Sequence, residues 1–156
     1  MDISEKRSGA GKVKRRLDRQ LSGLGFKRTK PTFWTRPNAL TIEFVHLHLY
    51  TFAASFRVHC GTRTWDDPFE AIALNGPSSD GAPGSGFSFD TSESSQQECA
   101  ELISAYVHSQ ELWFIDQRGQ LDGAQSGARA ALEQPFSAKV SQENQARTEI
   151  LLGLKR

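Results

Sequence analysis

Two neighbouring β-prone runs constrain the fold of this chain more than any other feature. The first run covers residues 39–50 and the second covers residues 53–62, and both are rich in β-branched and aromatic residues. Only Thr51 and Phe52 separate them, so we predict an antiparallel hairpin, although the connection lacks the Asn-Gly pair typical of two-residue turns.

The register of this hairpin follows from keeping its apolar side chains on one face. We predict the register that places Tyr50 opposite Ala53, because a slip by one residue would mix the polar and apolar faces. The predicted core face carries Val45, Leu47, Leu49, Ala54, Phe56, Val58 and Cys60. The predicted opposite face carries Ile42, Phe44, His46, His48, Tyr50, Ser55, Arg57 and His59.

Helical and strand patterns flank the hairpin. Residues 1–10 are predicted as a flexible polar leader, and a helical period begins at Lys12 and ends at Gly25. A short strand is expected over residues 32–36. After the hairpin, the expected elements are a short helix over 67–74, a short strand over 87–89, a helix from Ser92 or Ser94, and a weak helix over 138–152 with Val140, Arg147, Ile150 and Leu151 toward one side.

The order of these elements indicates one α+β domain over residues 11–156, since 156 residues are about one domain's length. We expect an antiparallel sheet of about four strands, with helices packed mainly on one face. The type of the apolar stretch over residues 112–115 stays open between a strand and a docking turn.

Charge is distributed unevenly along the chain. Residues 1–36 hold eleven Lys and Arg against three acids, and residues 37–156 hold eight against fifteen. This asymmetry is typical of a nucleic-acid contact, of an acidic partner, or of one part of a fold neutralising the other. The candidate residues for a polyanion or an acidic partner are Lys12, Lys14, Arg15, Arg16 and Arg19. Nucleic acid is not favoured, because no recognised binding motif accompanies them.

The hairpin holds the best candidate site. Three of the four histidines lie on its polar face, and the candidate ligand-binding set is His46, His48, Tyr50, Arg57 and His59. Imidazoles near neutral pH could perform acid–base work or hold a small ligand, and the arginine could hold a phosphate or carboxylate. The alternative is a structural or solvated set. We predict neither a metal nor another cofactor, because no Asp or Cys on that face completes a ligand set.

The two cysteines do not indicate a disulfide framework. Cys60 and Cys99 belong to no C-x-x-C pair, and Cys60 cannot meet its neighbour His59 because adjacent strand residues point to opposite faces. We expect buried thiols in a cytoplasmic protein, since the N-terminus lacks the apolar stretch of a secretory signal. No apolar run is long enough to indicate a membrane-spanning helix.

Short motifs along the chain carry a resemblance. They are Gly25-Phe26-Lys27-Arg28, then Phe33-Trp34 with Arg36, and, after the hairpin, the stretch over residues 112–116. This plan resembles a group of small uncharacterised bacterial α+β domains, over residues 12–118. The resemblance implies no catalytic residues. Some members lie near toxin and immunity genes, which implies a protein-binding role. Two departures are His46 and His48, where a Gln/Asn-type segment is expected, and the continuation past residue 118.

The resulting hypothesis is a non-catalytic bacterial accessory protein that binds a protein partner, as an immunity-type inhibitor does. One alternative is a small-ligand-binding or enzymatic domain that uses the His/Arg face of the hairpin. A second is nucleic-acid binding through the basic N-terminal helix. Self-association into a symmetric homodimer would use an exposed strand edge or the Trp113-Phe114 patch.

Overall fold

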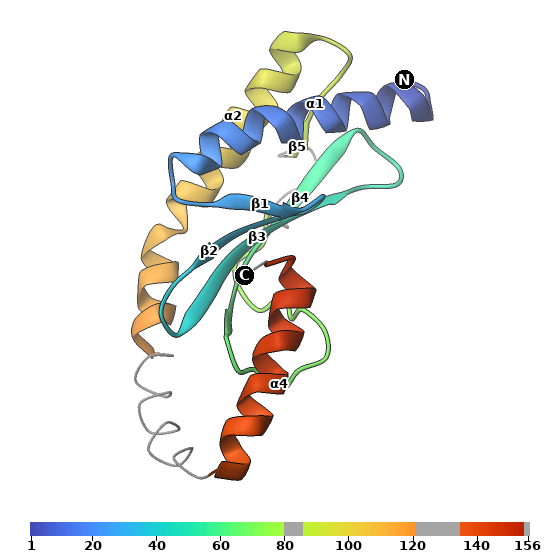
Figure 1. Cartoon of the computed structure of the whole chain (residues 1–156). Helices are drawn as coiled ribbons and strands as arrows, with labels where there is room; N and C mark the ends of the chain where they lie inside the picture. Colours follow the sequence, from blue (N-terminus) through green and yellow to red (C-terminus); the bar gives the residue numbers. More distant parts are fainter. Residues whose placement is uncertain (80–85, 121–134, 155–156) are drawn as a thin grey trace.

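A five-stranded antiparallel sheet forms the centre of the molecule, with its strands in sequence order (Figure 1). The computed structural model describes residues 1–79, 86–120 and 135–154. The strands are β1 (Lys27–Lys30), β2 (Phe33–Pro37), β3 (Thr41–Leu49), β4 (Ser55–Thr64) and β5 (Phe87–Ser88). The predicted α+β class is confirmed. The sheet has five strands where about four were expected.

The β3–β4 register keeps the predicted faces but not the predicted pairs. His46 lies opposite His59 and His48 lies opposite Arg57. The prediction that Tyr50 pairs with Ala53 is wrong, because the backbone N–H of Tyr50 donates to the carbonyl of Ser55. The turn is therefore longer than two residues. Because the shift is even, every side chain stays on its predicted face.

One face of the sheet, the core face, packs against three helical segments. They are α1 (Ile3–Ser22), α2 (Glu93–Ser109) and a helix over residues 111–120. Val45, Val58 and Cys60 of the sheet share this core with Leu17 and Ile103 of the helices. The stretch over 112–115, predicted as a strand or a docking turn, is thus helical.

Residues 3–10 belong to α1, so the prediction of a flexible leader is wrong. Asp2 caps the helix, accepting a hydrogen bond from the backbone of Glu5 while the Glu5 side chain accepts one from the backbone of Asp2. Gly9 is buried, and a Cβ built on it would lie 2.8 Å from the ring of Phe89. The polar composition of this segment concealed a tertiary contact that depends on a small residue.

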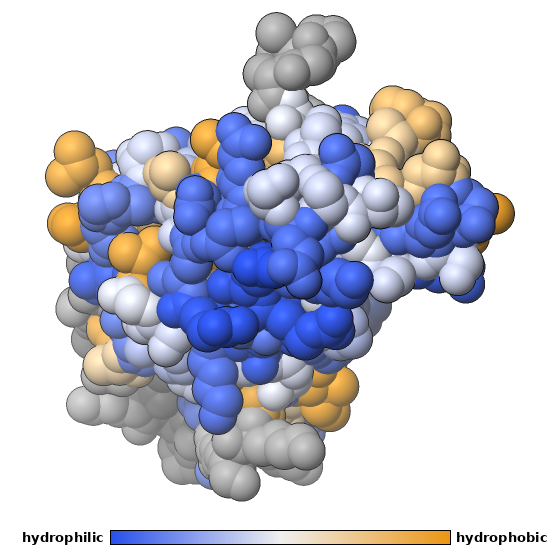
Figure 2. Space-filling model, turned by 90° about the horizontal axis from the view of Figure 1, so that it is seen from above, coloured by the Kyte–Doolittle hydropathy of each residue, from blue (hydrophilic) through white to orange (hydrophobic). Residues whose placement is uncertain are grey.

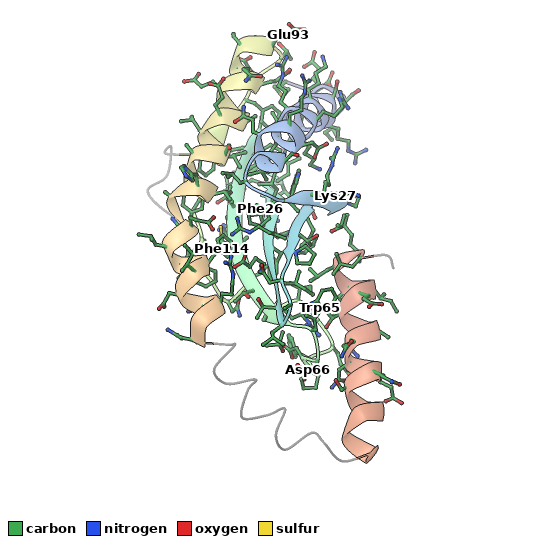
Figure 3. All side chains as sticks on the ribbon, turned by 60° about the vertical axis from the view of Figure 1, so that its left-hand side comes forward. Phe26, Lys27, Trp65, Asp66, Glu93 and Phe114 are labelled. Atoms are coloured by element: carbon green, nitrogen blue, oxygen red, sulfur yellow. The ribbon has the colours of Figure 1, made fainter. Side chains whose placement is uncertain are left out.

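On the other face of the sheet, the outer face, the described residues provide only a partial cover. α4 (Pro135–Leu152) lies across the sheet from α2 (Figure 3), and its Leu152 packs on Ile42 and Phe44. Ile150, predicted to lie on the packed side with Arg147, is 73% exposed. The side chain of Val140 lies outside the described residues.

Residues 67–74 are not the predicted helix. The buried Arg63 guanidinium donates to the carbonyls of Asp67, Phe69 and Ala71. These residues would form the first turns of the expected helix. Its Nε also donates to the hydroxyl of Thr148 in α4. Carbonyls that accept from Arg63 are drawn away from the ladder that a helix would need. Among the residues that the structure describes, no helix combines the length and apolar character needed to span a bilayer.

Candidate functional site

All five predicted ligand-binding residues lie together on the outer face. We call them the imidazole cluster: His46, His48, Tyr50, Arg57 and His59. The rings of His46 and His59 stack at 6.0 Å between centroids, and those of His48 and Tyr50 meet edge-on at 5.6 Å. Arg57 donates from Nε to the Tyr50 hydroxyl at 3.1 Å and lies over the Tyr50 ring. The prediction of one shared face was therefore right.

The electrostatic environment of His46 favours its neutral form. Partial burial lowers its pKa from the usual 6.5, and the charges of His59, His48 and Lys14 lower it further. A hydrogen bond between Nδ1 and the carbonyl of Thr32 acts in the opposite direction. The charges that act on His46 are thus all positive.

The five basic residues predicted on α1 do not share one face. Arg16 turns toward α2, where it donates to Gln97 at 2.7 Å. Lys12, Arg15 and Arg19 are exposed. Figure 2, seen from above the α1 end of the molecule, shows hydrophilic side chains gathered across the middle of this surface. Lys14 is half-buried and belongs to neither group.

Lys14 adjoins the imidazole cluster instead. Burial lowers its pKa from 10.5, and the charge of Arg28 lowers it further. Arg28 is paired with Asp18 at 2.7 Å. Within the described part of the chain, Lys14 has no hydrogen bond or ion pair of its own, yet it lies near enough to His46 to act on its pKa. Sequence periodicity missed this neighbourhood, because it depends on how α1 is rotated over the sheet.

A pocket that sequence analysis missed lies between the start of α1 and the β3–β4 turn. Its volume is about 490 Å³, and its walls include Ile3, Arg7, Tyr50 and Phe52. The Phe52 ring is 83% exposed and contacts the Tyr50 ring at 5.1 Å between centroids. Lys6 fixes the turn by donating from Nζ to the carbonyls of Tyr50 and Thr51. Because Tyr50 belongs to both, the pocket continues the imidazole cluster.

A second charged group, also missed, lies at the edge of the core face. The Glu43 carboxylate is 1% exposed and accepts from Arg36 at 2.7 Å and from Arg118 at 2.9 Å. Arg36 also pairs with Glu111, and its guanidinium lies over the rings of Phe26 and Phe114, which Figure 3 shows between the sheet and the helix over 111–120. The motifs that carried the resemblance thus meet at Arg36.

The position of Phe114 corrects one expectation about self-association. Phe114 is fully buried beneath Arg36, so the Trp113-Phe114 patch is not the surface predicted for self-association. Leu112 and Ile115, on the same helix, are the exposed apolar residues there.

The side chains around the imidazole cluster indicate which ligands it suits. Cys60 lies on the core face, and burial raises the pKa of its thiol to about 12, so it is not a nucleophile for the cluster at neutral pH. Among the described residues, no group of three His, Cys, Asp or Glu side chains is placed to hold a metal ion. Cationic and ring side chains together suit an anion with planar groups.

Comparison of the chain with models of protein families, with curated proteins and with solved structures gives no match. The function proposed below therefore depends on the geometry and charge of this chain alone.

Proposed function

We propose that this protein is a non-catalytic binding protein for a phosphate-bearing polyanion, which it holds on the imidazole cluster and Lys14. The observation that carries the proposal is the half-buried ammonium of Lys14. It lies beside the charge of Arg28 and near the imidazole of His46, and it has no acidic partner among the described residues.

Holding like charges together in a partly desolvated place costs free energy. An anion that occupies the place between α1 and the cluster would relieve that cost, and it would receive donors from Lys14, His48 and Arg57. The exposed cations of α1, Lys12 and Arg15, extend the favourable potential along the same helix. Protonation of His46 would then strengthen binding as the pH falls, since a bound phosphate favours the protonated imidazole.

An enzymatic role is less well supported. The two cysteines are buried with raised thiol pKa values, so neither supplies a thiolate to the cluster. An acidic protein is the competing partner, because charge alone would attract it too. The experiment below distinguishes an acidic protein from a phosphate-bearing polyanion.

The test uses the full chain and long-chain inorganic polyphosphate, measured by isothermal titration calorimetry at low salt. We expect binding that weakens steeply with added salt. Lys14→Gln and Arg57→Gln should each weaken it about fivefold or more, which corresponds to roughly 1 kcal/mol for each lost charged contact.

The matched control is Arg147→Gln on α4, which removes the same charge but keeps a donor for the carbonyl of Pro68. It should leave the affinity within twofold of the original chain. Absence of polyphosphate binding, or equal loss in all three variants, would contradict the proposal. If a carrier protein coated with polyglutamate binds tightly and polyphosphate does not bind, the result would favour an acidic protein as the partner.

A further inference from the structure

We infer that the polyanion is a single-stranded nucleic acid, of which a base stacks on Phe52 while its phosphates follow the imidazole cluster and Lys14. This inference rests on the proposed function and names the ligand class of the same site. It is carried by the ring side chains at the β3–β4 turn.

Ring side chains follow one another at every second residue from the outer face into the turn. They are His46, His48, Tyr50 and Phe52. The successive contacts from His48 to Tyr50 and from Tyr50 to Phe52 are 5.6 and 5.1 Å between ring centroids. The His48 and Tyr50 rings meet at 90° and the Tyr50 and Phe52 rings at 33°, and the last ring of this row, that of Phe52, is the exposed one. An exposed aromatic ring beside cations is typical of single-strand binding, in which bases stack and phosphates meet positive charge.

Phe52 is the most informative member of the row. A phenylalanine that is 83% exposed contributes little to the core, yet its turn is held by the two hydrogen bonds from Lys6. The ring is therefore presented on a fixed backbone beside a pocket of about 490 Å³. A pocket of this size suits one planar group.

The pocket lining brings both signs of charge. Asp2, whose carboxylate is engaged in capping α1, lies there together with Lys6 and Arg7. The base is therefore placed by the Phe52 ring and not by the charge of the pocket. The phosphates are placed farther from the turn, toward the Arg57 guanidinium beside Tyr50 and toward Lys14 near His46.

The geometry also separates single strands from duplexes. Stacking on Phe52 requires an open base face, which a paired and stacked duplex does not offer. A basic surface without the ring row would bind both through the phosphates alone.

The experiment measures fluorescence anisotropy of a labelled 15-nucleotide oligothymidine with the full chain. The comparison probes are a 15-nucleotide abasic strand with the same phosphates and the oligothymidine annealed to its complement. We expect oligothymidine to bind at least tenfold more tightly than either. Phe52→Leu should weaken oligothymidine binding by roughly fivefold to thirtyfold, while Phe52→Trp should preserve it.

Controls keep folding and charge effects apart. Phe69→Leu changes an exposed phenylalanine outside the pocket, 52% exposed, and should leave the affinity unchanged. Phe52 is exposed, so Phe52→Leu should retain the melting temperature of the original chain. Lys14→Gln should weaken oligothymidine and abasic strand alike.

The outcomes are distinguishable. Equal binding of oligothymidine and abasic strand, with no effect of Phe52→Leu, would overturn base stacking and leave the polyanion proposal intact. Tighter binding of the duplex would also overturn it. Failure of every strand and of polyphosphate to bind would overturn both proposals.

Discussion

The buried Arg36–Glu43 pair provides the sharpest test of how the motifs stabilise this fold. Glu43 is 1% exposed and Arg36 is 16% exposed on their side chains. Replacing Arg36 by alanine leaves the Glu43 carboxylate with Arg118 alone. It also removes one hydrogen bond to the carbonyl of Leu24 and two to the carboxylate of Glu111. We therefore expect Arg36→Ala to be strongly destabilising.

The magnitude follows from the burial and the rings. Removing one partner of a buried ion pair costs about 3–5 kcal/mol, and loss of the contacts with Phe26 and Phe114 adds roughly 1 kcal/mol. The sum is about 4–6 kcal/mol of unfolding free energy. At roughly 2–4 °C for each kcal/mol in a chain of this length, the melting temperature should fall by about 10–20 °C.

Arg28→Ala is the matched control. The Arg28–Asp18 pair has the same 2.7 Å distance as the Arg36–Glu43 pair, and its arginine also lies over an aromatic ring, that of Trp34. Its side chains are about one third exposed, at 29% and 34%, so the pair is worth about 0–1 kcal/mol.

Thermal unfolding followed by circular dichroism compares the two variants. If Arg36→Ala lowers the melting temperature no more than Arg28→Ala, burial does not control the contribution of these pairs. Should Arg36→Ala fail to fold, Glu43→Gln, which keeps the side-chain volume, should still lower the melting temperature more than Arg28→Ala.

Two further predictions concern stability. A Cβ on Gly61 would lie 2.2 Å from the Phe44 ring, so Gly61→Ala should cost about 1–3 kcal/mol or more, whereas Gly119→Ala, with nothing within 4 Å, should cost nothing in urea unfolding. Because the pKa of His46 is lowered by burial and by the charges of His59, His48 and Lys14, the unfolded chain binds this proton more readily; stability should fall as the pH drops through 6.5. Urea unfolding midpoints measured at pH 7.5 and pH 5.5 test this prediction. If His46→Gln leaves the difference between the two midpoints unchanged, another group causes the pH dependence of stability.

The faces of the hairpin were predictable because alternation survives an even register error. The pairs themselves were not, since the turn after Tyr50 lacks a sequence signal that fixes its length. Over residues 67–74, the local capping signal was real, as the Asp67 side chain accepts from the backbone of Phe69. Arg63 nevertheless determines the conformation of this segment from outside it, because its guanidinium donates hydrogen bonds to three of the carbonyls in the segment.

The candidate site was predictable to a similar degree. The imidazole cluster followed from β3 and β4 alone, because its members are strand neighbours. Predicting that Lys14 adjoins the cluster would require knowing how α1 is rotated over the sheet. Predicting the pocket at Phe52 would require knowing that α1 begins at Ile3. Both depend on tertiary contacts such as that between Gly9 and Phe89, which leave no period in the sequence.

The partial covering of the outer face follows from a change of polarity along β3. Ile42 and Phe44 are apolar and lie under Leu152 of α4, whereas the next two outer positions are His46 and His48. Extending an apolar cover over the histidines would desolvate imidazoles that already lie among positive charges, which is unfavourable. This change of polarity supports the proposal that a phosphate-bearing ligand, and not another apolar helix, occupies the histidine half.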